Sequence, residues 1–224
     1  MLDPVATRRR YGDRCGVAHA LDVLGERWAL LIVRDLLLGP KRFTDLQAGL
    51  AGAGPNVLTT RLNDLRDAGV VRKRTLPPPA GSRVYELTEW GADLEPIVVA
   101  LGLWGARSPV LRPEGELRAD SLMLSLLGAL NLSALGPGGG VFEIRLGRDV
   151  FTVTVRDAVR VARGQPTGPP DAVVDTDCRV LGAHMAGEED VASAIAQGWV
   201  LLGGDEPSAR ALLTAVAGTD VSAA

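Results

Sequence analysis

Residues 56–87 read NVLTTRLNDLRDAGVVRKRTLPPPAGSRVYEL, and this stretch decides the fold of the first half of the chain. Its first part, residues 56–68, carries leucines at helical spacing on one face and short polar side chains on the opposite face. Gly69 ends that helix, and residues 70–76 and 83–87 then read as two strands around a proline-rich turn. The leucines are Leu58, Leu62 and Leu65, and the opposing polar residues are Asn56, Thr60 and Asn63.

Helical patterns flank this stretch on both sides. Upstream, residues 17–24, 28–38 and 43–50 have the apolar spacing of helices. Downstream, Thr88 is positioned to cap a last helix, which Pro96 is expected to bend because proline lacks a backbone donor. The apolar stripe of this last helix needs a partner and gives the dimerisation candidates Leu94, Ile97, Val98, Leu101 and Trp104. These parts together predict a mainly α winged helix-turn-helix domain.

The outer face of the helix and the basic hairpin are the parts suited to DNA. An α-helix fits the major groove, where hydroxyl and amide side chains match the donors and acceptors of base edges. Arginines on a hairpin supply charge for phosphates or for a narrow minor groove. The predicted DNA-binding residues are Asn56, Thr59, Thr60, Arg61, Asn63, Arg72, Lys73, Arg74 and Arg83, with Arg83 as the main candidate on the hairpin.

The charge is divided unevenly along the chain, although the net charge of the 224 residues is only -3. Residues 1–112 hold 16 Lys and Arg against 12 Asp and Glu, a net +4, and the remainder carries -7. Residues 108–116 contain two prolines and a glycine and read as a linker. We therefore expect two domains, 1–110 and 118–224, of which only the first is suited to a polyanion.

The second half has the pattern of an α+β domain with an antiparallel sheet. An apolar-faced helix is expected at 121–132, and alternating patterns predict strands near 142–146, 151–155, 159–163 and 172–176. Short helices at 178–186 and 188–197, a strand at 199–202 and a closing helix at 207–217 complete the prediction.

No enzyme, metal or membrane signature stands out in the sequence. His19 and His184 lie in no arrangement of nucleophile and base, and the two cysteines, Cys15 and Cys178, have no metal-ligand or disulfide spacing. Apolar stretches end before the roughly 18 residues that a membrane span needs. We therefore expect no catalytic or metal site, no cofactor, no membrane contact and a cytoplasmic location.

Dense motifs give the first half a family resemblance. It reads CGVAHALDVLGERW at 15–28, RDLL at 34–37, RFTDL at 42–46, LTTRL at 58–62 and YELT at 85–88, followed by Pro96 and Trp104-Gly105. In these motifs the chain resembles the HxlR-type transcriptional regulators, MarR-like winged-helix proteins. The resemblance covers about half of the chain and implies a homodimer, joined through terminal helices, on near-palindromic, double-stranded operator DNA.

The resemblance also raises the question of a thiol sensor at Cys15. In several members a cysteine at the matching place senses oxidants or electrophiles, and Arg14 and the start of a helix both favour a thiolate here. The alternative is a small buried hydrophobic residue.

Residues 120–217 resemble the sterol-carrier-protein-like fold in element order, and GWVLLGGD at 198–205 is similar to its closing motif. That resemblance implies a pocket for a small apolar effector, with lining candidates Met123, Phe142, Phe151, Met185 and Trp199. The same side chains equally suit a packed core.

The sequence as a whole predicts a transcriptional regulator, with repression by promoter occupancy favoured over activation, whose acidic domain tunes DNA binding or assembly. The alternatives are a lipid-binding carrier and an assembly scaffold in which the winged helix does not read DNA.

Overall fold

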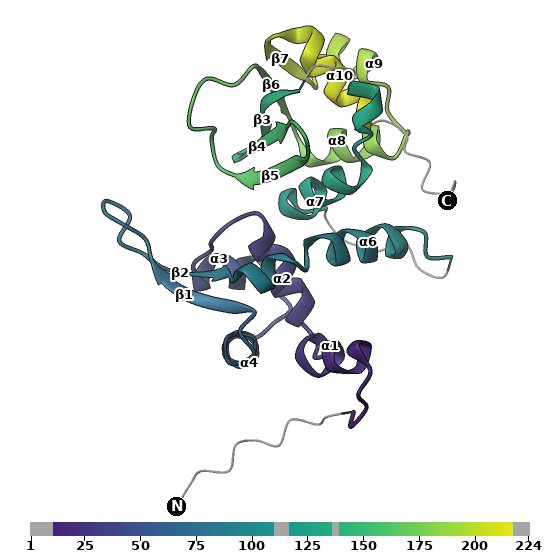
Figure 1. Cartoon of the computed structure of the whole chain (residues 1–224). Helices are drawn as coiled ribbons and strands as arrows, with labels where there is room; N and C mark the ends of the chain where they lie inside the picture. The colour runs from purple at the N-terminus through teal and green to yellow at the C-terminus, as the bar shows by residue number, and fades with distance from the viewer. Residues whose placement is uncertain (1–10, 110–116, 136–138, 217–224) are drawn as a thin grey trace, which may run out of the picture. The chain divides into compact units, whose positions relative to one another are not determined.

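The computed structural model describes residues 11–109, 117–135 and 139–216 (Figure 1). Contacts divide the chain into two units, Met1–Glu95 and Pro96–Ala224, and each is described by itself. Most of the expected linker at 108–116 lies outside the described residues, so the boundaries 1–110 and 118–224 stay predictions. Within the described ranges every helix is too short or too polar to span a lipid bilayer.

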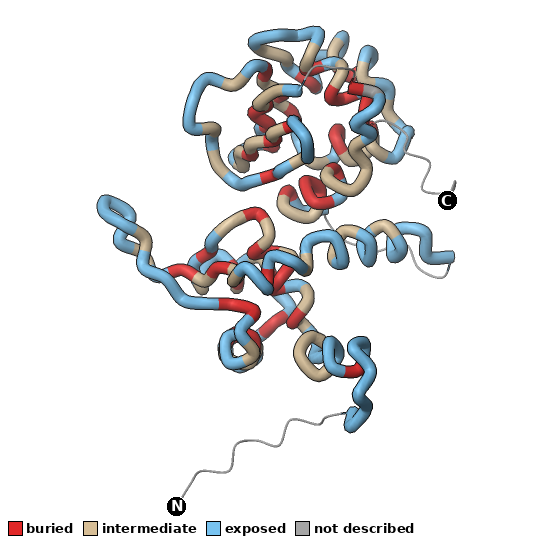
Figure 2. Tube along the Cα trace, in the orientation of Figure 1, coloured by how far each residue is buried: buried red, intermediate tan, exposed pale blue. Residues whose placement is uncertain are grey.

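The first unit is built on helices that match the predicted ones closely. They are α1 (Gly16–Leu24), α2 (Ala29–Leu37), α3 (Phe43–Gly49) and α4 (Pro55–Asp67). Pro55 starts α4 in the position where proline's fixed φ suits a helix and its missing N–H costs nothing. Apolar residues of these helices form the core, and Figure 2 colours the buried positions red along the backbone trace. The fully buried ones include Ile32, Val33, Leu46, Leu58, Leu62 and Leu65.

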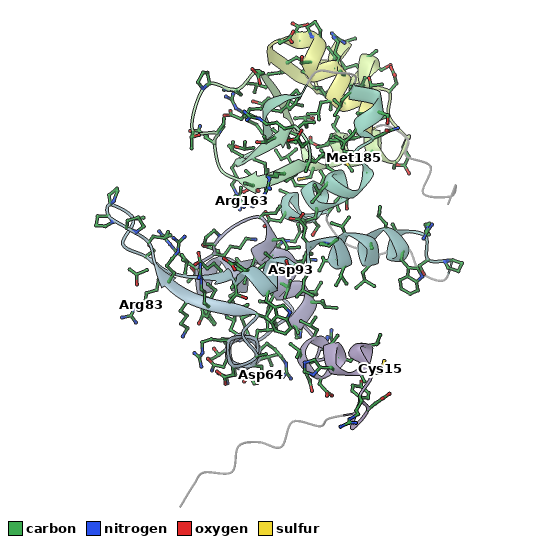
Figure 3. The ribbon with its side chains drawn as sticks, viewed as in Figure 1. Cys15, Asp64, Arg83, Asp93, Arg163 and Met185 are labelled. Atoms are coloured by element: carbon green, nitrogen blue, oxygen red, sulfur yellow. The ribbon has the colours of Figure 1, made fainter. Side chains whose placement is uncertain are left out.

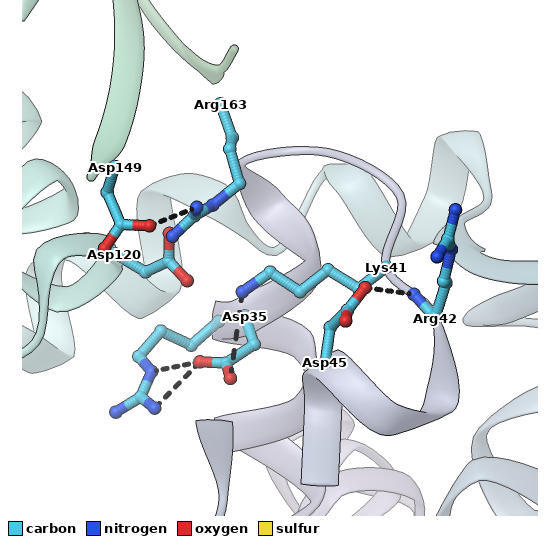
Figure 4. A network of polar contacts seen from close by, with 8 residues as sticks. Asp35, Lys41, Arg42, Asp45, Asp120, Asp149 and Arg163 are labelled. Atoms are coloured by element: carbon cyan, nitrogen blue, oxygen red, sulfur yellow. Dashed lines mark hydrogen bonds and ion pairs between the residues drawn. The ribbon is translucent and has the colours of Figure 1, made fainter. Parts of the chain in front are cut away.

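A β-hairpin, the wing, follows α4. It consists of β1 (Val71–Thr75) and β2 (Arg83–Leu87), which pair antiparallel. Its base is fixed by Lys41, whose backbone exchanges hydrogen bonds of 2.9 and 2.8 Å with Tyr85. The Lys41 ammonium lies 3.9 Å from buried Asp35 of α2, and Asp35 also accepts from Arg34 at 2.8 Å (Figure 4). Backbone pairing and the buried carboxylate therefore fix the wing to the helical core.

The predicted long helix after the wing is two helices. Thr88 caps α5 (Glu89–Ala92), accepting from the Gly91 N–H at 3.0 Å. A separate α6 (Glu95–Ala106) follows, and from Pro96 onward it belongs to the second unit. Pro96 does not bend a continuous helix, as the sequence predicted, because it lies in the first turn of α6, where helical N–H groups have no acceptor.

The second unit contains a five-stranded mixed sheet in the order β5-β4-β3-β6-β7. The other neighbouring strands are antiparallel, but β3 and β6 run parallel, which corrects the predicted antiparallel sheet. Alternation predicts which face a side chain occupies but not which strand pairs with which. The strands are β3 (Gly140–Leu146), β4 (Asp149–Val155), β5 (Val159–Arg163), β6 (Ala172–Thr176) and β7 (Leu201–Gly204).

Helices cover one face of this sheet. Figure 1 shows α7, α8 and α10 on the same side, and α7 packs on β5 while α10 packs on β6 and β7. The covered face buries alternate apolar residues such as Phe142, Phe151 and Val174. The helical elements are α7 (Ala119–Ala129), the 3-10 turn η1 (Leu132–Leu135), α8 (Cys178–Met185), α9 (Val191–Ala196) and α10 (Glu206–Val216).

Two predicted elements of the second unit are displaced. The helix expected at 188–197 starts only at Val191, because the Asp190 carboxylate accepts from the Ser193 N–H at 2.9 Å and caps it there. The strand expected at 199–202 lies at 201–204, where Leu201 pairs with Asp175 and Gly204 with Ala172.

Candidate nucleic-acid interface

The outward face of α4 carries the polar residues that the sequence predicted. Asn56, Thr59 and Thr60 are exposed and Asn63 is half-buried. The Thr60 hydroxyl donates to the Asn56 carbonyl at 2.9 Å, so only its lone pairs remain to face a base edge. Thr60 is therefore suited to accept from an amino group of adenine or cytosine.

Arg61 differs from its predicted role at the flank of this face. One of its terminal nitrogens lies 2.7 Å from Asp64 and the other lies 2.8 Å from Glu26, in the turn between α1 and α2. The Nε of Arg61 is buried without a hydrogen-bond partner among the described residues. Arg61 thus binds protein carboxylates instead of extending from the face.

Two of the wing arginines are also held by a carboxylate. Glu86 is buried on β2, directly opposite Arg72. Its two oxygens accept from Arg72 and Arg74, each at 2.8 Å. The three side chains carry one net positive charge, so their attraction for phosphate is weaker than two free arginines would give.

The other two basic residues of the wing remain available. The Lys73 ammonium lies 5.2 Å from the centre of the Tyr85 ring, a cation–π contact that leaves the charge at the surface. Arg83 is exposed at the start of β2 and extends away from the wing (Figure 3). Within the part of the chain that the structure describes, Arg83 has no ion pair or side-chain hydrogen bond. Among the described residues of the wing, Arg83 is thus an exposed cation that no carboxylate binds.

An apolar row on α6 is left partly uncovered. Three of the dimerisation candidates, Ile97, Leu101 and Trp104, are exposed. Val98 on the same helix and Leu94 just before it are half-buried, so the described part of this chain covers the row only in part. On α1, Val17 and Leu21 are exposed as well. Exposed apolar side chains at helical spacing on two helices are typical of a protein interface.

The two cysteines lie in opposite environments. Cys15 is exposed immediately before α1, where hydrogen bonds from the backbone N–H groups of Ala18 and Val17 lower the pKa of its thiol. Burial, followed by the charges of Asp149, Asp177 and Asp120, raises the pKa of Cys178. Since Cys15 is not buried, its interpretation as a packed hydrophobic residue is wrong.

The pocket candidates of the second unit do not share one environment. Met123, Phe142 and Phe151 are at most 1% exposed, whereas Met185 is half-buried and Trp199 is 42% exposed. The Trp199 ring lies 5.7 Å from the Arg179 guanidinium. The first three residues therefore fill the core and the last two lie nearer the surface; Met185 is labelled in Figure 3.

Other polar groups of the second unit bind one another. His184 is buried, and its ring nitrogens lie 3.1 Å from the Glu189 carbonyl and 2.8 Å from the Leu213 carbonyl. In the described ranges, His, Cys, Asp and Glu form no group of three that could hold a metal ion. His184 thus links α8 to α10 and to the turn that precedes α9.

The carboxylates that restrain these cations were not among the residues predicted from the sequence. The place of Glu86 in the predicted strand 83–87 indicates that it faces a residue of the other hairpin strand. Only the hairpin register identifies that residue as Arg72. No sequence pattern indicates that Glu26 binds Arg61, because the two residues are 35 positions apart in the sequence.

Comparisons with known proteins agree on the first half of the chain. A family model described as HxlR-like helix-turn-helix matches residues 23–110. The HTH-type transcriptional regulator YvaP of Bacillus subtilis is 38% identical over 85 residues, which are 38% of this chain and 79% of YvaP. The regulator sll1512 of Synechocystis sp. is 30% identical over 95 residues, covering 42% of this chain and 70% of sll1512. Neither regulator is characterised.

A regulator of Bacillus subtilis is among the solved structures that are similar in sequence. The reduced form of the transcriptional regulator YodB from B. subtilis is 28% identical and covers 44% of this chain and 97% of YodB, with a TM-score of 0.39.

Proposed function

The chain belongs to the HxlR-like helix-turn-helix family, and we propose that it is a homodimeric repressor that binds operator DNA through α4 and the wing. The observation that carries this proposal is the outward face of α4, where Asn56, Thr59 and Thr60 are exposed and are followed by a wing with an exposed Arg83. The amide and hydroxyls have the chemistry of base readers, and Arg83 has that of a phosphate or minor-groove contact.

The homodimer is supported by the partly uncovered row on α6. A second copy of the chain would bury Ile97, Leu101 and Trp104, which are 57%, 45% and 68% exposed here. Two copies related by a two-fold axis place their recognition helices in successive half-sites, about one turn of DNA apart or a small multiple of it. The expected operator is a near-palindrome.

Repression follows from occupancy alone. A dimer on a promoter excludes polymerase without further contacts, whereas activation needs a surface that binds polymerase. The proposed site of action is the cytoplasm.

The test is selection from random duplex DNA with the purified full-length protein at near-physiological salt. Enrichment of a near-palindrome is the expected result. A separate measurement of the mass of the protein in solution should give the mass of two chains. Absence of any enriched sequence with folded protein would overturn operator recognition and favour a carrier or an assembly scaffold. An enriched single half-site bound by one chain would overturn the dimer only.

A second function of the acidic unit, binding a small apolar effector that weakens DNA affinity, rests on the resemblance to the sterol-carrier-protein-like fold. Of the lining candidates only Met185 and Trp199 are accessible to such a molecule, because Met123, Phe142 and Phe151 fill the core. The effector weakens DNA binding only as far as it binds the state that cannot bind DNA more tightly than the state that can. A panel of fatty acids and sterols that changes neither the melting temperature nor operator affinity would remove this function and leave a role in assembly.

A further inference from the structure

We infer that Arg61 is a positioning residue that sets the orientation of the recognition helix by binding Glu26 of the α1–α2 turn, instead of contacting DNA itself. This inference rests on the proposed function, since it concerns how α4 is presented to an operator. It adds a mechanical link between α1, which carries exposed apolar residues, and the helix that reads DNA.

The bonds of Arg61 oppose a direct role in DNA binding. Both of its terminal nitrogens bind carboxylates, Asp64 at 2.7 Å on the same helix and Glu26 at 2.8 Å across the turn. Its side chain is 22% exposed, and its Nε is enclosed without a partner among the described residues. A phosphate cannot reach Nε, and at the one remaining N–H of each terminal nitrogen it would lie beside a carboxylate that already neutralises much of the guanidinium charge.

The same turn holds the start of α4 through Trp28. Trp28 has a left-handed backbone, with φ of 80°, which is strained for a bulky residue. A Cβ added at Gly52, in the turn before α4, would lie 2.7 Å from Cη2 of the Trp28 indole. Only glycine permits this close approach, and the indole is therefore packed against the backbone that leads into α4.

The α1–α2 turn contacts α4 and the segment before it at two places, and two contacts fix the direction of a helix better than one does. Trp28 acts at the segment that enters α4, and Glu26 acts at Arg61, near the middle of the helix. Glu26 and Trp28 also join α1 to α2, since the Ala29 N–H donates to the Glu26 carbonyl at 3.0 Å. A displacement of α1 against α2 is thus passed to α4 through this turn.

Glu26 is well suited to a geometric role because its side chain is 62% exposed. An exposed ion pair contributes little to folding stability. Its removal is therefore expected to leave the fold intact while releasing one of the two contacts that orient α4.

The test is a double-mutant cycle of Glu26→Ala and Arg61→Ala in the full-length protein, with the operator selected by the unmodified protein as probe. Each single variant is expected to lose up to about fivefold in operator affinity, since the pair biases the orientation of α4 by no more than its own free energy. The double variant is expected to lose no more than either single variant. Melting temperature and non-specific binding should change little, and the dependence of affinity on salt should keep its slope. Glu26→Gln, which retains an oxygen acceptor for Arg61, should recover much of the loss.

Asp67→Ala is the matched control, because Asp67 is also an exposed carboxylate that pairs with an arginine, at 3.1 Å from Arg66 on the same helix. Loss of an acidic charge near DNA generally strengthens binding, so Asp67→Ala should raise affinity whereas Glu26→Ala lowers it. The inference is overturned if Glu26→Ala also raises affinity, or if Arg61→Ala alone weakens binding and reduces the salt slope by about one unit, as removal of a phosphate-binding cation would. An unmodified protein that selects no operator contradicts the proposed function instead.

Discussion

The two units use the same residue types in opposite ways. On the wing, Arg83 is exposed and has no bond to another described side chain, whereas Arg163 on β5 donates to Asp120 and Asp149, each at 2.8 Å (Figure 4). Burial alone would lower the pKa of Arg163, but hydrogen bonds and the charges of these two carboxylates outweigh it and raise the pKa. Arg83 is thus available to a ligand, and Arg163 is a structural link.

Apolar residues show a similar contrast within the second unit itself, Pro96–Ala224. Phe151 is fully buried in the second unit, and Trp104 on α6 is 68% exposed. Residue type therefore gives the chemistry that a side chain is capable of, and the surrounding structure decides whether it stabilises the fold or remains for a partner.

The largest expected effect tests the contrast between buried and exposed aromatic residues. Phe151→Ala removes a fully buried ring and should lower the free energy of unfolding by about 3–5 kcal/mol. Trp104→Ala should leave the folded chain nearly as stable but shift dimers toward monomers. Denaturant unfolding and light scattering measure the two effects. A decrease below about 1 kcal/mol for Phe151→Ala would instead indicate a loosely packed site of the kind an apolar ligand needs.

The next largest expected effect is on sequence discrimination, and it compares two helical hydroxyls, Thr60 in the first unit and Ser125 in the second. Thr60 donates to the carbonyl four residues earlier, and Ser125 does the same on α7 at 3.1 Å. Thr60→Ala combined with Asn63→Ala should reduce discrimination between operator and unrelated DNA, by about 1–3 kcal/mol for each base that is no longer read.

Ser125→Ala is the control and should leave discrimination unchanged. Competition binding with operator and scrambled duplexes measures this difference. Equal decreases in affinity for both DNAs would show that the α4 residues bind the backbone of DNA and not its bases.

A smaller effect separates the two arginines. Arg83→Ala should weaken binding to all sequences and reduce the salt dependence of log K by about one unit, as expected when one phosphate is no longer neutralised. Arg163→Ala should leave that slope unchanged and lower the melting temperature. A change in preference for A·T-rich steps after Arg83→Ala would assign Arg83 to the minor groove instead.

The smallest effect is a difference in thiol reactivity with pH. The thiolate is the reactive form, so a lowered pKa moves alkylation of Cys15 to lower pH, and a raised pKa moves alkylation of Cys178 to higher pH. Iodoacetamide labelling followed by peptide mass spectrometry, with Cys15→Ser and Cys178→Ser as references, measures both profiles. Coinciding profiles would contradict the assigned environments.

The elements of the winged helix followed from the sequence because they depend on local patterns. The spacing of Leu58, Leu62 and Leu65 predicts both the helix and its buried face, and the hairpin strands differ from the prediction by at most two residues. The two helices in place of one around Pro96 were missed, since a proline is compatible with either a bend or a helix start. The parallel pairing of β3 and β6 was missed because it depends on contacts between distant segments.

The sequence by itself determined the helix that is proposed to read DNA, the polar residues on its outer face and the basic character of the wing. Only the tertiary structure decided which of the basic residues are available. Glu86 binds Arg72 and Arg74, Glu26 binds Arg61, and Arg83 is left exposed. The physical reason is that helical and strand periodicity assigns a side chain to a face, whereas its ion pairs depend on hairpin register and on turns far away in the chain.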